Sequence, residues 1–244
     1  MKATQPNQDN RTMQPQVYIL PGTFCTGLMF EQQISVLERA NYQVTVVPFN
    51  AEESIASLVN LTVKTMANQP GVVIGFSMGG IVALELANHC PELITKLCLL
   101  STNYHADTEE KRLARQAHIA QAEQNSLLSV IEHSYLPNYF YCHQQAYADI
   151  VVKMANELGL TVFKAQLSAL ATRKHNLSAL ENIAKPVLIL AGQQDKLCIA
   201  EYQHAMHEAC HHSDLILLDR CGHFPTLERG QLVSQLLLAW LEES

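Results

Sequence analysis

The sequence lacks an apolar stretch long enough to cross a membrane, because none reaches the about 18 consecutive apolar residues that a transmembrane helix requires. Its N-terminal segment, residues 1–16, is rich in Gln and Asn and has no apolar core of the kind found in secretory signal peptides. We therefore expect this segment to be a flexible polar leader. We also expect the protein to be cytoplasmic, with no membrane partner.

Basic runs and cysteine pairs are also missing. The chain has 16 Lys and Arg against 23 Asp and Glu, a formal net charge of −7, and its basic residues are scattered. This charge pattern excludes a nucleic-acid surface, so no nucleic-acid partner is expected. The seven cysteines are an odd number and include no C-x-x-C pair, which predicts free thiols in a reducing compartment.

The chain is rich in apolar residues, which make up 48% of its 244 positions and suffice for one sizeable core. Six short apolar runs recur, each followed by turn residues and most by a helical pattern. Their nearly continuous apolar character predicts strands buried on both faces of a mostly parallel α/β sheet flanked by helices. The expected strands are residues 17–20, 44–49, 72–76, 97–101, 187–192 and 215–218.

Residues 103–185 interrupt this alternation, because they are charged and helix-forming and contain no comparable strand. We expect them to form a helical cap inserted between two core segments, residues 17–102 and 186–244. The cap carries eight basic and eight acidic residues. This balance predicts no electrostatic steering toward a strongly anionic substrate.

The most informative segment is residues 72–81, where an apolar run leads into Gly75-Phe-Ser77-Met-Gly79 and then into a helical pattern. A serine in so sharp a strand-to-helix turn has strained backbone angles, and a side chain at either glycine would collide with its neighbours. The turn exposes the Ser77 hydroxyl at the edge of the sheet. It also directs the Met78 N–H and the positive end of the following helix toward the position of an oxyanion.

A nucleophilic serine requires a base to take its proton and an acid to orient that base. His223 is the favoured base, because it lies in the loop after the last expected strand, where open α/β sheets place functional residues. Asp195, just after the preceding expected strand, is the favoured acid. Asp219, four residues before His223, is the alternative acid. A purely structural Asp195 would instead cap a turn or the next helix.

Three motifs in this order resemble those of the α/β-hydrolase superfamily: the serine turn, the acid loop that ends at Asp195 and the histidine loop Cys221-Gly-His223-Phe-Pro. The spacings agree as well, with 118 residues from Ser77 to Asp195 and 28 from Asp195 to His223, as in small esterase-like and lactonase-like members. The resemblance covers residues 17–241. It implies the α/β-hydrolase fold with Ser77, Asp195 and His223 as catalytic residues.

The resemblance also implies a second oxyanion donor, the residue that follows the glycine after the first strand. In this chain that residue is Thr23, which joins Met78 as the expected oxyanion hole. Most members have His-Gly at this point, whereas this chain has Pro21-Gly22, and Phe24 is the alternative donor. Because the donor is a backbone N–H, the hole does not depend on the histidine.

These residues imply a serine hydrolase that cleaves a small carboxylic ester through an acyl-enzyme, with no metal or organic cofactor. Its partner is a small-molecule acyl substrate, and the chain is expected to be a monomer or a homodimer. An apolar pocket between the sheet edge and the cap favours a small acyl group over a sugar or a peptide. The expected substrate contacts are Phe24, Leu28, Met29, Tyr104, Phe140, Phe163 and Phe224.

Other activities use the same three residues, among them hydrolysis of an enol-lactone, a thioester or a carbon–carbon bond. A hydrolase fold can also serve as a non-catalytic ligand receptor. Strict preference for a dicarboxylate-like substrate would require a buried arginine in the pocket. The cap offers Arg112, Arg115 and Arg173 for that role.

Two further sets of side chains carry weaker hypotheses. His204, His207, Cys210 and His211 share one stretch of expected helix and could contact a metal, although ligands on a single helix seldom complete a tetrahedral site. Cys25 is a poor alternative nucleophile because it does not lie in a strand-to-helix turn, and the same holds for Cys221.

Overall fold

The computed structural model describes residues 14–243. Most of the leader predicted over residues 1–16 lies outside the described residues, and Gln16 already begins the first strand. The described part contains one six-stranded sheet in the order β2-β1-β3-β4-β5-β6, in which every neighbouring pair is parallel. The predicted parallel α/β sheet is therefore confirmed. Its strands are β1 (Gln16–Leu20), β2 (Gln43–Val46), β3 (Gly71–Phe76), β4 (Ile94–Leu100), β5 (Val187–Gly192) and β6 (Ser213–Leu218).

Each strand overlaps its predicted run, but β2 ends earlier than expected. Val47 N–H donates one more bond to Ile19 O at 2.9 Å, and Phe49 N–H then bonds back to Val47 O at 3.0 Å as the chain leaves the sheet. The expectation that all strands are buried on both faces is wrong for the two edge strands. β2 and β6 keep partly exposed side chains, because each pairs with a neighbour on one side only.

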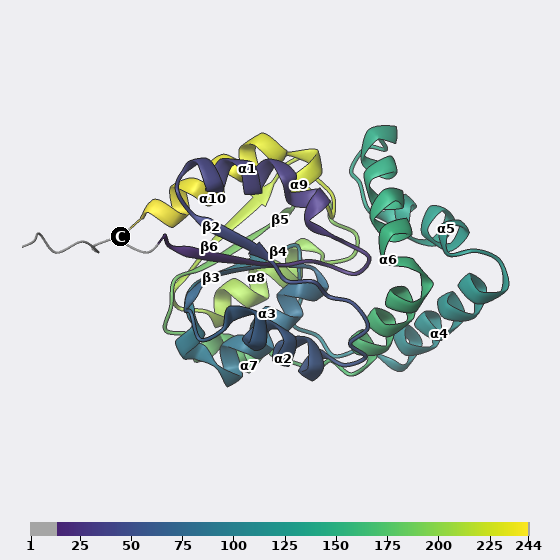
Figure 1. The fold of residues 1–244 in the computed structure, drawn as a ribbon, viewed down its shortest axis with the longest axis horizontal. Coiled ribbons are helices and arrows are strands. Elements are labelled where there is room, and N and C mark those ends of the chain that lie inside the picture. The colour runs from purple at the N-terminus through teal and green to yellow at the C-terminus, as the bar shows by residue number, and fades with distance from the viewer. Residues whose placement is uncertain (1–13, 244) are drawn as a thin grey trace, which may run out of the picture.

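Helices cover both faces of the sheet (Figure 1). α1 and α10 contact each other on one face, whereas α2, α3, α7 and α8 form the layer on the other face. Short polar side chains cap helices where the sequence provides them. Ser54 accepts the Ser57 N–H at the start of α2, and Thr108 accepts the Lys111 N–H at the start of α4. No helix in the described part of the chain is long and apolar enough to span a bilayer.

The α-helices, in chain order, are α1 (Glu31–Arg39), α2 (Ile55–Met66), α3 (Met78–His89), α4 (Glu109–Gln124), α5 (Leu127–Val130), α6 (Gln145–Ala171), α7 (Leu177–Glu181), α8 (Ala200–Ala209), α9 (Pro225–Glu228) and α10 (Gly230–Glu242). Short turns of 3₁₀ or π helix occur at Gly27–Phe30, Pro91–Leu93, Ile131–Tyr135 and Leu136–Asn138.

In the segment predicted as a helical cap, α4, α5 and α6 lie beyond one end of the strands, on the right of Figure 1, and these three helices are called the cap from here on. α4 contacts α5 and α6, and α6 is interrupted at Gly159, whose φ of 74° and ψ of 178° are not helical. α7 also belongs to the segment predicted as the cap, residues 103–185, but it contacts α3 and α8 of the core.

The common direction of the strands positions the site. All six strands have their carboxyl ends at the same edge of the sheet, and the loops that follow them meet there beneath the cap. These loops carry Thr23 after β1, Ser77 after β3, Asp195 after β5 and His223 after β6. Residues up to 200 positions apart in the chain are thereby brought to one edge.

Candidate active site

The strand-to-helix turn at Ser77 has the strain that its sequence predicts. Ser77 has φ 51° and ψ −112°, between the end of β3 and the start of α3. A methyl group at Gly75 would come within 2.6 Å of Gly79 O, and one at Gly79 would come within 2.0 Å of Leu20 O. Ser77 N–H donates to Leu100 O at 2.9 Å, which fastens the turn to the neighbouring strand. The two glycines are therefore required by close backbone approach.

Ser77, His223 and Asp195 form a continuous hydrogen-bonded chain. The Ser77 Oγ lies 3.1 Å from His223 Nε2, and His223 Nδ1 lies 2.8 Å from Asp195 Oδ2. An ionised carboxylate can only accept, so Nδ1 carries the proton of the neutral imidazole. Nε2 is thereby left free to accept the hydroxyl proton of Ser77.

Asp195 is held by more than the histidine. Its second carboxylate oxygen accepts the N–H groups of Leu197 at 2.8 Å and Cys198 at 3.0 Å. Burial alone would raise the pKa of the Asp195 carboxyl, but its interaction with His223 and the two N–H bonds hold that pKa below its ordinary value. The group is therefore a buried carboxylate anion in contact with the imidazole of His223.

The alternative acid, Asp219, does not reach the histidine. Its side chain is 78% exposed, and its carboxylate accepts a hydrogen bond from Gln194 Nε2 at 3.2 Å. The geometry thus pairs His223 with Asp195.

Glu228 holds the histidine loop, although no sequence pattern predicts this role for it. Its carboxylate accepts the N–H groups of Gly222 at 2.9 Å and Tyr141 at 2.7 Å. Burial raises the pKa of this carboxyl. His223 N–H also donates to Tyr139 O at 2.7 Å, so the loop is bound to the cap segment at two points.

Two backbone N–H groups remain available beside the serine. Among the described residues, neither Thr23 N–H nor Met78 N–H has a protein acceptor. Phe24 N–H, the alternative donor, is engaged, because it donates to the buried Gln166 Oε1 at 2.7 Å. The conformation therefore favours Thr23 over Phe24 as the second oxyanion donor.

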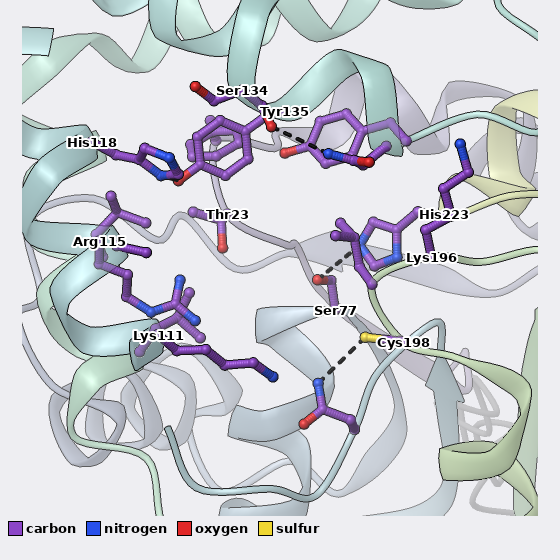
Figure 2. A pocket seen from close by; sticks show the side chains of 18 of the residues that line it. Thr23, Ser77, Lys111, Arg115, His118, Ser134, Tyr135, Lys196, Cys198 and His223 are labelled. Carbon is purple, nitrogen blue, oxygen red and sulfur yellow. Dashed lines mark hydrogen bonds between the residues drawn. The ribbon is translucent and has the colours of Figure 1, made fainter. Parts of the chain in front are cut away.

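Ser77 and His223 open into a cavity of about 500 Å³ between the sheet edge and the cap. Figure 2 shows Thr23, Ser77 and His223 at its core side and His118 and Tyr135 at its cap side. Two predicted substrate contacts, Phe24 and Phe224, line this cavity.

The other five predicted contacts, all of which the structure describes, do not line the cavity. Met29 is buried in the core, and Phe163 packs behind Phe24 at a ring distance of 5.4 Å. Phe140 packs on Phe224 at 5.6 Å. Leu28 lies in a separate groove near α1, and Tyr104 packs against two histidines, His105 and His175. These assignments are corrected because an apolar residue near the site in sequence can face the core.

Comparison with known proteins agrees with this geometry. The family model described as serine aminopeptidase, S33, matches residues 52–230. The chain belongs to this family. Its hydrolase fold is that of the α/β-hydrolase superfamily, so the predicted resemblance is confirmed.

A curated relative of this S33 hydrolase is the uncharacterized hydrolase YugF of Bacillus subtilis (strain 168), 24% identical over 191 residues that cover 75% of this chain and 69% of YugF. A similar solved structure is a malate-bound thermophilic esterase from Thermogutta terrifontis, with TM-score 0.84, 20% identity and coverage of 93% and 89% of the two chains. The enol-lactonase from Burkholderia xenovorans LB400 has TM-score 0.83, 15% identity and coverage of 96% and 94%. At these identities the structures share the fold.

Arg112, one of the three arginines that the sequence offers for the pocket, does not line the cavity and pairs with Glu109 instead. The cavity of the S33 hydrolase is lined by four cations, which include the other two arginines. They are Lys111 and Arg115 of α4, Arg173 after α6 and Lys196 beside Asp195. The spacing of Lys111, Arg115 and His118 was an available signal, since residues four and three apart share one helix face.

The suggested metal ligands His204, His207, Cys210 and His211 form no metal site among the described residues, and only the first two lie on α8, which ends at Ala209. In the described part of the chain, the one group of three or more possible ligand residues whose ligand atoms lie within 4.8 Å of each other is Asp195, Cys198 and His223. Asp195 and His223 bind each other, and burial raises the pKa of Cys198 to about 12, which keeps its thiol protonated. Burial likewise raises the pKa of the alternative nucleophiles Cys25 and Cys221. A thiolate is therefore disfavoured at all three cysteines.

Proposed function

We propose that this S33 hydrolase cleaves a small carboxylic ester through an acyl-enzyme, with Ser77, His223 and Asp195 as catalytic residues. The observation that carries the proposal is the hydrogen-bonded chain of 3.1 Å from Ser77 Oγ to His223 Nε2 and 2.8 Å from Nδ1 to Asp195. It ends at a strained serine that faces a cavity. This arrangement of nucleophile, base and orienting acid fits acyl transfer.

In the first half-reaction, Ser77 Oγ attacks the acyl carbonyl carbon while His223 Nε2 takes the hydroxyl proton. The carbonyl oxygen becomes an oxyanion, which the N–H groups of Thr23 and Met78 stabilise together with the N-terminus of α3. Collapse breaks the bond to the leaving oxygen. His223 transfers its proton to that oxygen, so an alcohol leaves and the acyl group stays on Ser77.

The second half-reaction repeats these steps with water as the nucleophile. His223 Nε2 takes a proton from water, and the hydroxide adds to the acyl carbon to form a second oxyanion. Collapse expels Ser77 Oγ, which recovers the proton from His223. The balance is one ester and one water consumed, one carboxylic acid and one alcohol released.

The lining of the cavity supports an ester over the substrate named in the family's description. An aminopeptidase holds the free ammonium group of its substrate, for which a carboxylate is the strongest partner. Among the described residues that line the cavity there is no Asp or Glu, and four are Lys or Arg. A cationic amine is therefore disfavoured in this cavity.

The test is labelling with a fluorophosphonate, followed by intact-mass measurement and peptide mapping, beside turnover of a short-chain 4-nitrophenyl ester. We expect one label per chain, at Ser77, and measurable turnover. Ser77→Ala should abolish labelling and lower kcat by roughly 10⁴-fold or more, with the melting temperature nearly unchanged. Ser178→Ala, at an exposed serine of α7, is the matched control and should label as the parent does.

Unchanged turnover in Ser77→Ala would refute the proposal. Absence of any label with the parent protein would favour a ligand receptor on the hydrolase fold. A lactone and a thioester assayed beside the 4-nitrophenyl ester show whether either is cleaved with a higher kcat/KM than the ester.

A further inference from the structure

The cavity carries a charge opposite to that of the whole chain. The protein has a formal net charge of −7, yet its cavity is lined by four cations, Lys111, Arg115, Arg173 and Lys196, and by no Asp or Glu among the described residues. Figure 2 shows Lys111 and Arg115 reaching in from α4, across the cavity from His223. The balance of charge in the cap sequence therefore does not describe the charge at the site.

One carboxylate behind the cavity wall compensates only part of this charge. Asp107, whose side chain is fully buried, accepts bonds from Arg115 Nε at 2.6 Å and from Arg173 Nη2 at 2.6 Å. Two guanidinium groups thus share a single anion. Lys111 and Lys196 have no carboxylate within 4.0 Å in the described part of the chain.

The arginines also keep donors that the protein does not use. Arg173 is 93% buried, and its Nε has no acceptor among the described residues. Arg115 binds Asp107 through Nε and Nη2, which leaves Nη1 without an acceptor in the same part of the structure. A buried donor without a partner is costly, and a guanidinium binds planar or tetrahedral oxyanions through such donors.

On the basis of the proposed function, we propose that the substrate carries an oxyanion group, a carboxylate or a phosphate, at the end of its acyl chain away from the scissile ester. This group binds at Lys111, Arg115 and Arg173, which we call the anion site. The same cavity has apolar lining from Phe24, Leu167 and Leu170, which suits the carbon chain of such a substrate. The substrate class is therefore a half-ester of a small dicarboxylic acid or its phosphate analogue.

The test compares matched 4-nitrophenyl esters of equal chain length. The mono-esters of glutaric and adipic acid carry a free carboxylate, and the esters of valeric and hexanoic acid carry a methyl group in its place. The ester of 4-phosphonobutyric acid is the phosphate arm. We expect kcat/KM for the better anionic ester to exceed that of its neutral partner by about tenfold or more. Raising the salt concentration from about 0.05 M to about 0.5 M should reduce this ratio.

Lys111 is the residue to vary first, because Arg115 and Arg173 also hold the buried Asp107. Lys111→Met should lower the ratio of anionic to neutral kcat/KM by about tenfold, and Lys111→Arg should retain it. Lys153→Met is the matched control, an exposed lysine of the cap helix α6 outside the cavity lining, and should keep the parent's ratio.

Separate measurements test the anion site and the esterase activity, so that either can fail without the other. Labelling at Ser77 together with equal kcat/KM for anionic and neutral esters would overturn the anion site and leave the esterase proposal standing. If Ser77 is not labelled, calorimetry with glutarate and 4-phosphonobutyrate still tests the anion site. Binding that Lys111→Met weakens would support it, and no binding of either anion would refute it.

Discussion

At the scale of the residue, Asp195 illustrates how neighbours decide the role of a carboxylate. Asp195 and Asp219 both lie in loops at the carboxyl edge of the sheet. Asp195 is 97% buried and bonded to His223 and to two N–H groups, whereas Asp219 is exposed and bonded to an amide. Only the buried group can both fix the imidazole tautomer and stabilise its cation.

We therefore expect Asp195→Asn to lower kcat by about 10⁴-fold, because an amide at this position can favour the wrong tautomer of His223. Asp219→Asn is the matched control and should change kcat by less than about twofold, as befits an exposed group. Steady-state kinetics on one activated ester measures both. The reverse order of effects would assign the acid to position 219.

Among the helices, α6 forms part of the cap and also supports the loop after β1 that carries Thr23 and Phe24. Gln166, fully buried on α6, accepts the Phe24 N–H at 2.7 Å and donates to Phe49 O at 3.2 Å. Phe24 has φ 45°, a left-handed conformation that needs such support. One side chain of the cap thus fixes the loop that carries Thr23.

Replacement of Gln166 by Leu should leave two buried backbone groups without partners. We expect the free energy of unfolding, from urea denaturation, to fall by about 2–6 kcal/mol, since each of the two unpaired groups costs about 1–3 kcal/mol. The kcat should fall as well, because the Thr23 N–H loses its fixed position. Gln166→Glu keeps the acceptor for Phe24 and should lose less kcat than Gln166→Leu.

The matched control for this element is Gln116→Leu, at an exposed position of α4, which should change stability by less than about 0.5 kcal/mol. A Gln166→Leu protein as stable and as active as the parent would show that α6 does not brace the loop.

At the scale of the whole molecule, Asp107 joins the start of the cap to its end. The residue precedes α4, and its two partners lie on α4 and just after α6. Burial alone would raise the pKa of the Asp107 carboxyl, but the hydrogen bond from Arg115 and the charges of Arg115 and Arg173 lower it below the ordinary value. The folded state therefore binds this proton less readily than the unfolded chain does.

A depressed pKa in the folded state gives stability that is present above the unfolded pKa of about 3.9 and is lost as the pH falls through the folded pKa. We expect Asp107→Asn to lower the free energy of unfolding at pH 7 by about 3–5 kcal/mol, because two guanidinium groups lose their buried partner. The difference from the parent should narrow below about pH 4. Urea denaturation at a series of pH values measures it, and a difference independent of pH would contradict this role.

Features whose sequence signal is local could be predicted from the chain alone. Residues 72–81 predict a strand, a strained turn and a helix from adjacent positions alone, and the structure contains all three. The motifs of Ser77, Asp195 and His223 are local patterns too, and each follows a predicted strand. Because parallel strands end at one edge, their order was enough to expect these residues at that edge.

Which distant side chains meet could not be predicted in this way, because it depends on the three-dimensional packing. In the structure, His223 pairs with Asp195 and not with Asp219. The Phe24 N–H donates to Gln166, and the side chains of Met29 and Phe163 are buried in the core. The fold also gathers cations from α4, from the end of α6 and from the loop after β5 around one cavity. Periodicity tells which face of an element is apolar, whereas the partner of each polar group depends on how the cap packs over the sheet. The charge of the site is a property of that packing.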